Sequence, residues 1–441
     1  MGAINGISQF YGQHVASLQQ HWETALAAEG YDAAVIHAGS KLASFLDDYE
    51  YPFRCNPHLL WWAPLLHHHD SALLVRPGQR PRLYYYQPDD YWHTPPADPE
   101  SWWASEFDVI AVRDPDAWKQ AGINSRTAYI GDAPGLIEAV AAKQLNPETL
   151  VNRIHLERTR KTAYEVACMA EAARLGAVAH TAALQAFREG LSEYEIHQRY
   201  CMSIQQVDAE LPYGNIVALN DHGAVLHYQA HEQQAPAVSR SFLIDAGATK
   251  HGYATDITRT YAASECEFAD LISAMDEMQL KLCGAVVSGL DYRDLHLRAH
   301  LDIARILVDF NIINTSAESA VETGLSGVFY PHGLGHFLGI QTHDVAGLIA
   351  DAQGTPIPRP EGHPFLRLTR RLEAGNVLTI EPGLYFIEPL LRKWRENGDV
   401  SAINWQKIDE LAPFGGIRIE DNMLVTDGAP RNLTREAFAG L

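Results

Sequence analysis

Cysteine and basic side chains are scarce in this sequence of 441 residues. Lys and Arg together number 34 against 55 Asp and Glu, which gives a formal net charge of −21. A surface of this sign repels the phosphates of nucleic acids and of anionic membranes, so we expect neither as a partner. The sequence has five widely spaced cysteines, an odd number that argues against a disulfide framework and against a thiolate zinc site: Cys55, Cys168, Cys201, Cys266 and Cys283.

Long apolar runs and export signals are also missing. No window approaches about 18 consecutive apolar residues, so no transmembrane helix is expected. The first ten residues contain no basic run followed by an apolar stretch, so no signal peptide is expected and a cytoplasmic location is predicted. Three common motifs do not occur either: the His-Glu-x-x-His zinc helix, the Gly-x-Ser-x-Gly elbow and the Gly-x-x-x-x-Gly-Lys-Ser/Thr loop.

The first third of the chain alternates strand-like and helix-like stretches. A helix-compatible stretch covers His14–Glu29, and it precedes the first of five short apolar runs. This alternation predicts an α/β domain over residues 1–155. The five runs that we interpret as strands are 33–37, 72–75, 83–86, 109–112 and 127–130.

The pattern changes near residue 150. Residues 152–198 have helical periodicity, broken at Gly190 and restarted with Ser192 as a plausible N-cap. Strand-like runs and glycine-rich turns follow, with two further helical segments near 269–288 and 292–310. The second part of the chain, residues 156–441, is therefore predicted to be an α+β domain.

Two aspartates mark a predicted hairpin in the second domain. An apolar run ends at Asp245, and Asp256 follows after a turn centred between Lys250 and His251. With that centre the two aspartates lie directly opposite each other, with Cβ atoms about 4.5–5.5 Å apart. Carboxylates so close repel unless a cation or a proton lies between them. The alternative is two solvated aspartates at a strand end.

Three histidines follow within twelve residues: His332, His336 and His343. Glycines separate them, and glycine lets a backbone approach a ligand closely. Imidazole is the commonest neutral metal ligand, whereas a single histidine is more often a core or surface residue. A cluster in a glycine-rich loop makes a binding site as reasonable an interpretation as packing.

Two glutamates complete the set of candidate ligands. The apolar run 377–380 ends at Glu381, and strand alternation places Arg418 and Glu420 on one face. An arginine there can orient a metal-bound carboxylate. Four carboxylates and one histidine suit Mn²⁺ or a similar hard divalent ion, and their charge balances two such ions. Two ions about 3.5–4 Å apart form a known hydrolytic centre.

The five candidates, in this order and with this spacing, resemble the ligands of the pita-bread metallopeptidases. The resemblance covers the whole chain and is greatest to the bacterial-type Xaa-Pro dipeptidases (prolidases); the sequence is also similar to organophosphorus acid anhydrolases. It includes three further segments, Phe45–Asp48, Pro52–Pro57 and Arg158-x-x-Lys161-Thr162-x-x-Glu165. The resemblance implies a pita-bread (creatinase/aminopeptidase-like) fold for residues 156–441. It also implies a homodimer, with the first domain on the dimerisation and substrate-access side.

The resemblance also implies a role for each ligand. Asp245 binds one ion, Asp256 and Glu420 bridge the two ions, which are expected to be Mn²⁺, and His336 and Glu381 complete the second ion. A hydroxide between the ions attacks the scissile carbonyl, and Glu381 carries its proton to the leaving proline nitrogen.

Further residues are implied to bind the substrate or assist the reaction. By resemblance, His227, His332 and His343 lie beside the ions, and His332 and His343 contact the proline end or stabilise the oxyanion. Arg370 is expected to hold the free C-terminal carboxylate, a task that Arg418 shares unless it only supports Glu420. At the amino end of the substrate we expect Asp47 or Asp48 of a partner subunit, and Tyr213, Trp61 and Trp62 either line the pocket or pack in a core.

The implied activity is hydrolysis of small dipeptides that end in proline, with release of free proline. Aminopeptidase P-like cleavage of longer Xaa-Pro peptides is the alternative within enzymes, and hydrolysis of organophosphate triesters would be a side reaction. A non-catalytic binding protein on the same scaffold is the alternative of another class. The five intact ligands argue against that last alternative.

Overall fold

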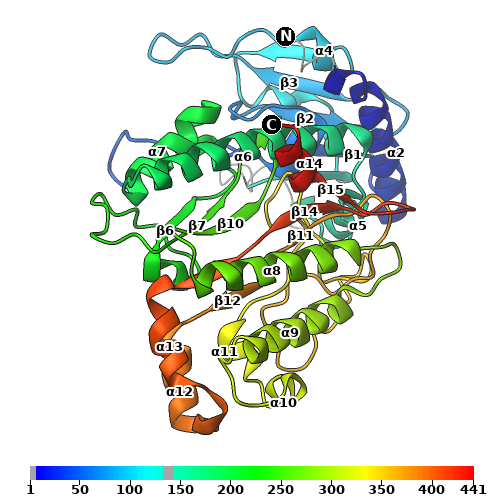
Figure 1. Ribbon diagram of the computed structural model, residues 1–441. Coiled ribbons are helices and arrows are strands. Elements are labelled where there is room, and N and C mark those ends of the chain that lie inside the picture. Colours follow the sequence, from blue (N-terminus) through cyan, green and yellow to red (C-terminus); the bar gives the residue numbers. More distant parts are fainter. Residues whose placement is uncertain (1–5, 133–143) are drawn as a thin grey trace. The chain divides into compact units, whose positions relative to one another are not determined.

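The computed structural model describes residues 6–132 and 144–441, and the chain divides into two compact units (Figure 1). The first unit comprises residues 1–168, 251–253 and 349–355, and the second comprises 169–250, 254–348 and 356–441. Within the described ranges, no helix combines the length and the apolar character needed to cross a membrane.

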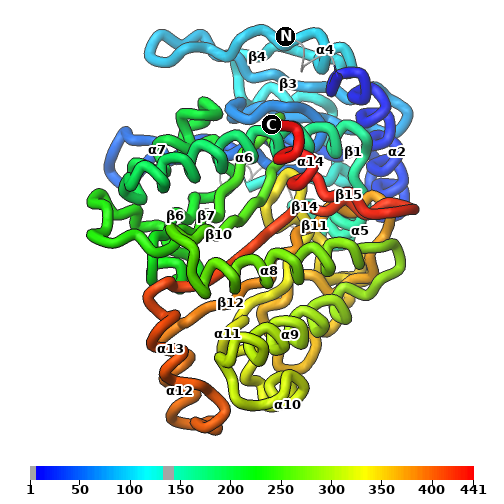
Figure 2. Tube along the Cα trace, in the orientation of Figure 1, coloured from blue at the N-terminus to red at the C-terminus, as the bar shows by residue number. Residues whose placement is uncertain are grey.

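A five-stranded mixed sheet forms the centre of the first unit, with strand order β4-β3-β2-β1-β5. The path of the chain through β1, β3 and β4 can be followed in Figure 2. Pairs β1–β2 and β2–β3 are antiparallel, whereas β1–β5 and β3–β4 are parallel. The predicted α/β pattern is therefore confirmed, with each strand beginning within one residue of its expected start. The strands are β1 (Ala33–His37), β2 (Ala72–Val75), β3 (Arg82–Tyr86), β4 (Asp108–Val112) and β5 (Thr127–Ile130).

The sheet lies at the centre of the first unit because apolar side chains cover it. Strand β1 is buried along its whole length because it has neighbours on both edges, and its apolar residues fill both faces. Helix α2 (Tyr11–Glu29) ends where Gly30 adopts a left-handed conformation, as helices commonly do. Trp61 and Trp62 of α3 (Pro57–Trp62) are fully buried in this unit, and Trp61 Nε1 donates to Glu165 at 3.1 Å. The structure thus favours core packing for these two tryptophans.

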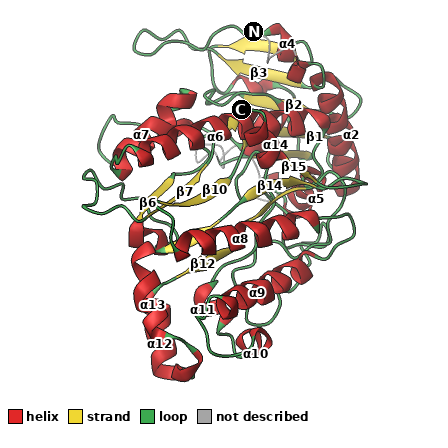
Figure 3. Cartoon of the chain, in the orientation of Figure 1, coloured by secondary structure: helices red, strands yellow, loops and turns green. Residues whose placement is uncertain are grey.

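Two helix-covered sheets make up the second unit (Figure 3). In the first, the later part of α6 (Ala163–Arg188) and α7 (Glu193–Ile204) pack on the sheet β10-β7-β6. In the second, α8 (Glu267–Gly284) and α9 (Tyr292–Asp309) share one core with β11 and β14. The strands are β6 (Ile216–Leu219), β7 (Ser241–Ala246), β10 (Ile257–Ala262), β11 (Val377–Ile380), β14 (Asp421–Leu424) and β15 (Arg431–Asn432).

The remaining elements are short. Two-stranded pairs are β8 (Thr249–Lys250) with β9 (Tyr253–Ala254), and β12 (Gly383–Tyr385) with β13 (Gly416–Arg418). The short helices are α4 (Ser101–Ala104), α5 (Glu148–Arg158), α10 (Ala317–Glu322), α11 (Ser326–Phe329), α12 (Glu388–Asn397), α13 (Trp405–Leu411) and α14 (Leu433–Ala439). Ser192 caps α7 in a capping box with Glu195, which confirms the predicted N-cap.

The hairpin that carries the two aspartates has a different register from the predicted one. Asp245 pairs with Thr258 rather than with Asp256. The turn lies one residue further along, at His251 and Gly252, which both adopt the positive φ that two-residue hairpin turns require. Moving a hairpin turn by one residue moves the register by two, so the predicted pairing was wrong, whereas the face on which the side chains lie is preserved.

Candidate metal centre

The structure brings the five predicted ligands together in the second unit. Asp256, His336 and Glu420 offer ligand atoms that all lie within 4.8 Å of one another. His336 Nε2 is 3.5 Å from Asp256 Oδ2 and also 3.5 Å from Glu381 Oε1. Asp245 joins the group through the hydroxyl of Tyr213, which contacts the Oδ1 atoms of both Asp245, at 2.8 Å, and Asp256.

The ligands converge because three of them lie at the ends of strands and because the loop of His336 lies close to the backbone of β11. Asp245 lies near the end of β7, Glu381 directly follows β11, and Glu420 lies between β13 and β14. The loop that carries His336 runs along β11, where Thr379 N donates to His336 O at 2.9 Å. Gly335 permits this contact because a Cβ at that position would collide with the carbonyl oxygen of Thr379.

The carboxylates are buried next to one another, and this raises their pKa values. Burial and the charge of Asp245 raise the pKa of Asp256, and burial and the charge of Asp256 raise that of Glu420. Burial raises the pKa of Glu381 to about 8 even though Arg418 counteracts the shift. Negative charges held so close call for compensation by protons or cations.

One buried oxygen in this group has no hydrogen-bond donor within the described residues. Glu420 Oε2 accepts from Thr258 Oγ1 at 2.7 Å, but Glu420 Oε1 is buried without a partner. A buried unpaired carboxylate oxygen is costly, and a cation would satisfy it. The donor set, four carboxylates and one imidazole, is of the hard type that divalent ions such as Mn²⁺ accept. The residues present therefore fit a metal centre.

The orientation and the protonation state of His336 suit a neutral metal ligand. Its Nδ1 lies 2.9 Å from the carbonyl oxygen of Phe337, and a hydrogen bond donated there leaves the lone pair of Nε2 directed at the carboxylates. Burial lowers the pKa of His336 to about 3, so the ring is neutral at physiological pH.

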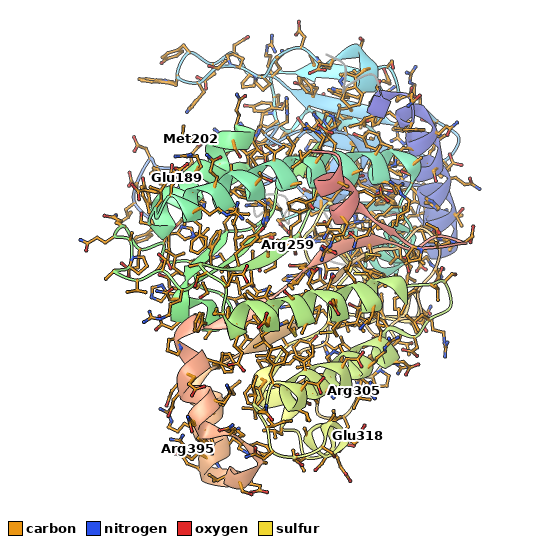
Figure 4. The ribbon with its side chains drawn as sticks, viewed as in Figure 1. Glu189, Met202, Arg259, Arg305, Glu318 and Arg395 are labelled. Carbon is orange, nitrogen blue, oxygen red and sulfur yellow. The ribbon has the colours of Figure 1, made fainter. Side chains whose placement is uncertain are left out.

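Buried polar groups hold the carboxylates in place. Arg418 Nη2 donates to Asp245 Oδ2 at 2.7 Å, and Asn422 Oδ1 accepts from the backbone N–H of Asp256 at 3.1 Å. Arg259, labelled in the interior of the second unit in Figure 4, donates to the carbonyl oxygens of Thr258 and Glu420 at 2.9 and 2.8 Å. Thr258 and Glu420 are therefore held together both by the bond between their side chains and by Arg259, which binds the carbonyl oxygens of both.

A chain of hydrogen bonds links His332, one of the predicted histidines, to Arg418 through Tyr385. Tyr385 Oη lies 2.9 Å from His332 Nε2 and accepts from Arg418 Nη1 at 2.8 Å. His332 Nδ1 is 2.8 Å from Gly333 O and 4.0 Å from Glu381 Oε2. Burial, aided by the charge of Arg418, lowers the pKa of His332 to about 3. The chain therefore presents a neutral imidazole beside Glu381.

Sequence reasoning missed Tyr385 and Thr258. Tyr385 lies four residues after Glu381 in a strand-like stretch, so strand alternation provided a signal for placing it on the same side. Thr258 had no such signal, because its partner Glu420 lies 162 residues away along the chain. Tyr213 was expected as a possible apolar wall, whereas its hydroxyl contacts two of the ligands.

The other predicted histidines lie near the centre. The ring of His343 is 4.4 Å from that of His336, nearly perpendicular to it. His227 lies on an exposed turn, and its charge is a minor cause, after burial, of the lowered pKa of His332.

Two arginines of one loop have different surroundings. Arg370 Nη2 lies 3.4 Å from Glu373 Oε1, and Arg370 O accepts from Tyr292 N. Arg367 is exposed, and its charge acts on the ligands: burial raises the pKa of Glu381, and Arg367 counteracts this rise. Sequence reasoning named Arg370 alone.

Asp47 and Asp48 lie on an exposed loop of the first unit. Asp47 Oδ1 accepts from the backbone N–H of Asp48 at 2.8 Å, a local turn contact. Their expected contribution to a partner subunit's site remains a prediction.

Comparisons with known proteins agree with the geometry of the centre. Residues 9–156 match the family described as Xaa-Pro dipeptidase, N-terminal domain, and residues 167–427 match metallopeptidase family M24. The chain is 48% identical over 436 residues to the Xaa-Pro dipeptidase of Xanthomonas campestris pv. campestris, with 98% of each chain covered. It is also 48% identical over 433 residues to that of Stenotrophomonas maltophilia, with 97% of each covered.

Solved structures show the same fold at lower identity. Proline aminopeptidase P II from Yersinia pestis matches with a TM-score of 0.72 and 23% identity, covering 97% of this chain and 96% of that one. Aminopeptidase P from E. coli with the inhibitor Pro-Leu matches with a TM-score of 0.72 and 22% identity, covering 97% of both chains. The expected pita-bread fold is thereby confirmed. The chain therefore belongs to metallopeptidase family M24 and, within it, to the Xaa-Pro dipeptidases.

Proposed function

We propose that this chain hydrolyses dipeptides whose second residue is proline and releases free proline. The observation that carries the proposal is the convergence of Asp256, His336 and Glu420 within 4.8 Å, with Glu381 3.5 Å from His336 and with one buried oxygen of Glu420 unpaired. The chain is 48% identical to an Xaa-Pro dipeptidase over nearly its full length. The residues that would hold two divalent ions, for which we propose Mn²⁺, are Asp245, Asp256, His336, Glu381 and Glu420.

The resemblance to the pita-bread metallopeptidases supports one division of the ligands between the two ions. Asp256 and Glu420 would be shared, Asp245 would serve one ion, and His336 with Glu381 would serve the other. Bound divalent ions supply Lewis acidity and activate water at neutral pH. The protein contributes the fixed positions of the carboxylates and the neutral state of the imidazole.

Glu381 is the proposed proton carrier. Its Oε1 lies 3.5 Å from the ligand nitrogen of His336, so its carboxylate would stand beside the activated water and could take up the proton that this water loses. The acceptor would be the leaving proline nitrogen. Neutral His332, fixed by Tyr385, would contact the proline end or the developing oxyanion together with His343, and His227 would lie beside them.

Recognition of a dipeptide requires a cation for its free C-terminal carboxylate, because that charge lies close to the scissile bond. We propose Arg370 for this role, with Arg418 sharing the charge or only supporting the ligands. Arg367 competes for the role, since its charge reaches Glu381. The tertiary Xaa-Pro amide has no N–H, so an enzyme that polarises the carbonyl has no need of that hydrogen bond.

Three finer features belong to the same proposal. We expect a cytoplasmic homodimer in which Asp47 or Asp48 of the partner subunit closes the amino end of the pocket. Tyr213, whose hydroxyl contacts two ligands, would line the pocket. Organophosphate triesters would be side substrates of the same centre.

Hydrolysis of Ala-Pro, Ala-Pro-amide and Ala-Pro-Ala by EDTA-treated protein, with and without added Mn²⁺, tests the proposal. Metal-dependent cleavage of Ala-Pro alone is expected. Cleavage of all three would establish aminopeptidase P-like activity instead, and cleavage of none, with metal bound, would reject the peptidase function.

The arginine assignment needs a matched pair of variants. Arg370→Ala is expected to raise KM for Ala-Pro more than Arg367→Ala does, because the lost contact is to the substrate carboxylate. The opposite order would transfer the role to Arg367.

A further inference from the structure

Three histidines form a second cluster in the second unit, and none of them belongs to the carboxylate centre. His296 and His300 lie one turn apart on α9, and His363 lies in the loop that leads to Arg367. Each offers a ring nitrogen, and these nitrogens lie within 4.8 Å of one another. The ring centroids are 4.5–4.8 Å apart in all three pairs, with interplanar angles of 66–90°. The rings thus surround one point rather than stacking.

The two helix histidines are buried with incomplete hydrogen bonding. Their exposed fractions are 1% for His296 and 2% for His300. Within the described part of the chain, His300 Nε2 has no hydrogen-bond partner, whereas His296 faces His363 through Nε2 and leaves only its opposite nitrogen, Nδ1, unpaired. Buried polar nitrogens are normally paired, so the unpaired Nε2 of His300 indicates an additional ligand.

His300 is oriented as a metal-binding histidine would be. Its Nδ1 lies 3.1 Å from Ser326 Oγ, and donation of that N–H fixes the tautomer whose Nε2 lone pair is free. That Nε2 is the unpaired atom. His296 Nε2 and His363 Nδ1 are 2.9 Å apart, and tetrahedral ligands at the usual Zn–N distance are about 3.3 Å apart. The nitrogens of His296 and His363 therefore need to separate only slightly to share an ion.

We propose that His296, His300 and His363 bind a single transition-metal ion of the Zn²⁺ type, distinct from the ions of the carboxylate centre. Three neutral imidazoles suit Zn²⁺ or Co²⁺, whereas Mn²⁺ prefers the carboxylates. Burial lowers the pKa of His300 to about 3, so no proton competes with the ion at neutral pH. Three protein ligands leave a fourth position for water.

An ion at this site would connect the loop of Arg367 to helix α9. His363 lies four residues before Arg367, and Gly333, next to His332, packs closely against the backbone of Phe365 and Leu366 in the same loop. Helix α9 is anchored at its first residue, where Tyr292 Oη donates to Thr379 O at 2.9 Å. The proposed ion therefore acts as a clip that restrains a loop beside the centre.

Metal stoichiometry of the full chain tests the site. Protein stripped with EDTA is reloaded with Co²⁺ and dialysed, and bound metal is measured by mass spectrometry together with the visible absorption of Co²⁺. To separate this ion from the others, the same titration is made in Asp256→Asn/Glu420→Gln protein. We expect about one Co²⁺ to remain in that background, and to be lost on adding His363→Gln.

Two controls keep the test interpretable. His363→Gln alters a half-buried loop residue, and His300→Gln tests the same site from the helix; thermal melts report whether each variant folds. His93→Gln, at an exposed histidine outside the cluster, should retain the ion. Equal Co²⁺ content with and without His363 in folded protein would overturn the proposal.

Limited proteolysis tests the clip itself. Zn²⁺ is expected to slow tryptic cleavage after Arg367 several-fold in wild-type protein and to have no effect in His363→Gln protein. Equal protection in both proteins would overturn the clip. Neither measurement depends on peptidase activity, so the outcome is independent of the proposed function.

Discussion

Thr258→Val should weaken metal binding at the carboxylate centre without disturbing the shape of the site. Thr258 is fully buried on β10, and its hydroxyl donates to Glu420 Oε2 at 2.7 Å. Valine fills nearly the same volume but cannot donate. Glu420 would then have no side-chain donor for either oxygen among the described residues, since Oε1 is already unpaired.

The expected size of the effect follows from the hydrogen bond. A hydrogen bond to a charged group contributes about 1.5–3 kcal/mol. Loss of an outer partner of a metal ligand typically costs about 10–100-fold in affinity, or about 1.4–2.8 kcal/mol. The two ranges agree, so Mn²⁺ affinity should fall by about 10–100-fold.

The assay is a titration of EDTA-treated protein with Mn²⁺. Binding is measured by calorimetry and by the electron paramagnetic resonance signal of free Mn²⁺. Thr260→Val is the matched control. Thr260 lies two residues further on the same strand and is also buried, but among the described residues its hydroxyl bonds only the backbone of Arg418, at 3.0 and 3.1 Å. Its loss should cost about 0.5–1.5 kcal/mol of folding stability and leave Mn²⁺ affinity close to that of wild type.

Two results would refute this reasoning. Wild-type affinity in Thr258→Val would show that the hydroxyl does not support the ligand. An equal loss in Thr260→Val would show that general loosening of β10, rather than the bond to Glu420, controls the affinity.

Three further predictions concern single side chains. Glu381→Gln should lower the turnover of Ala-Pro by at least about 10²-fold with an unchanged thermal melt, because it removes the proposed proton carrier; near-normal turnover in folded protein would reject that role. His180→Gln should make folding stability less sensitive to acid. Burial lowers the pKa of His180 from 6.5 to about 4, so between these pH values the unfolded chain binds a proton that the folded chain does not bind. This group therefore lowers the free energy of unfolding by up to about 1.4 kcal/mol for each pH unit of acidification. Glutamine can keep the bond that His180 Nε2 makes with Ala246 O, so urea unfolding between those pH values should give a smaller slope than wild type, and an identical slope would contradict the assignment. Ser192→Ala should cost about 1 kcal/mol in urea unfolding because it removes the capping box with Glu195, and an unchanged midpoint would be inconsistent with a stabilising cap.

Local patterns in the sequence were sufficient for much of the fold and for the set of candidate ligands. Asp245 and Glu381 could be identified because each follows an apolar run next to a glycine or proline turn, and such a pattern needs only a few neighbouring residues. Ser192 could be identified as a cap for the same reason, since its partner lies three residues away. The family followed from the order and spacing of the ligands.

The local sequence predicted the hairpin but was not sufficient to decide its register. Either Lys250-His251 or His251-Gly252 can be taken as the turn, and the choice changes the partner of Asp245 from Asp256 to Thr258. Only the positive φ angles at His251 and Gly252 decide it.

Tertiary structure decided which carboxylate each supporting side chain holds. Thr258 meets Glu420 across 162 residues. Arg418, which the sequence predicted as a support of Glu420, instead donates to Asp245 across 173 residues. His363 joins the helix histidines across 67 residues from His296. Sequence periodicity reaches only a few residues, whereas the partner of a buried polar group is selected by the packing of whole elements and by the cost of leaving that group unpaired. The sequence by itself therefore determined the family and the set of candidate ligands, and the tertiary structure determined what holds these residues in place.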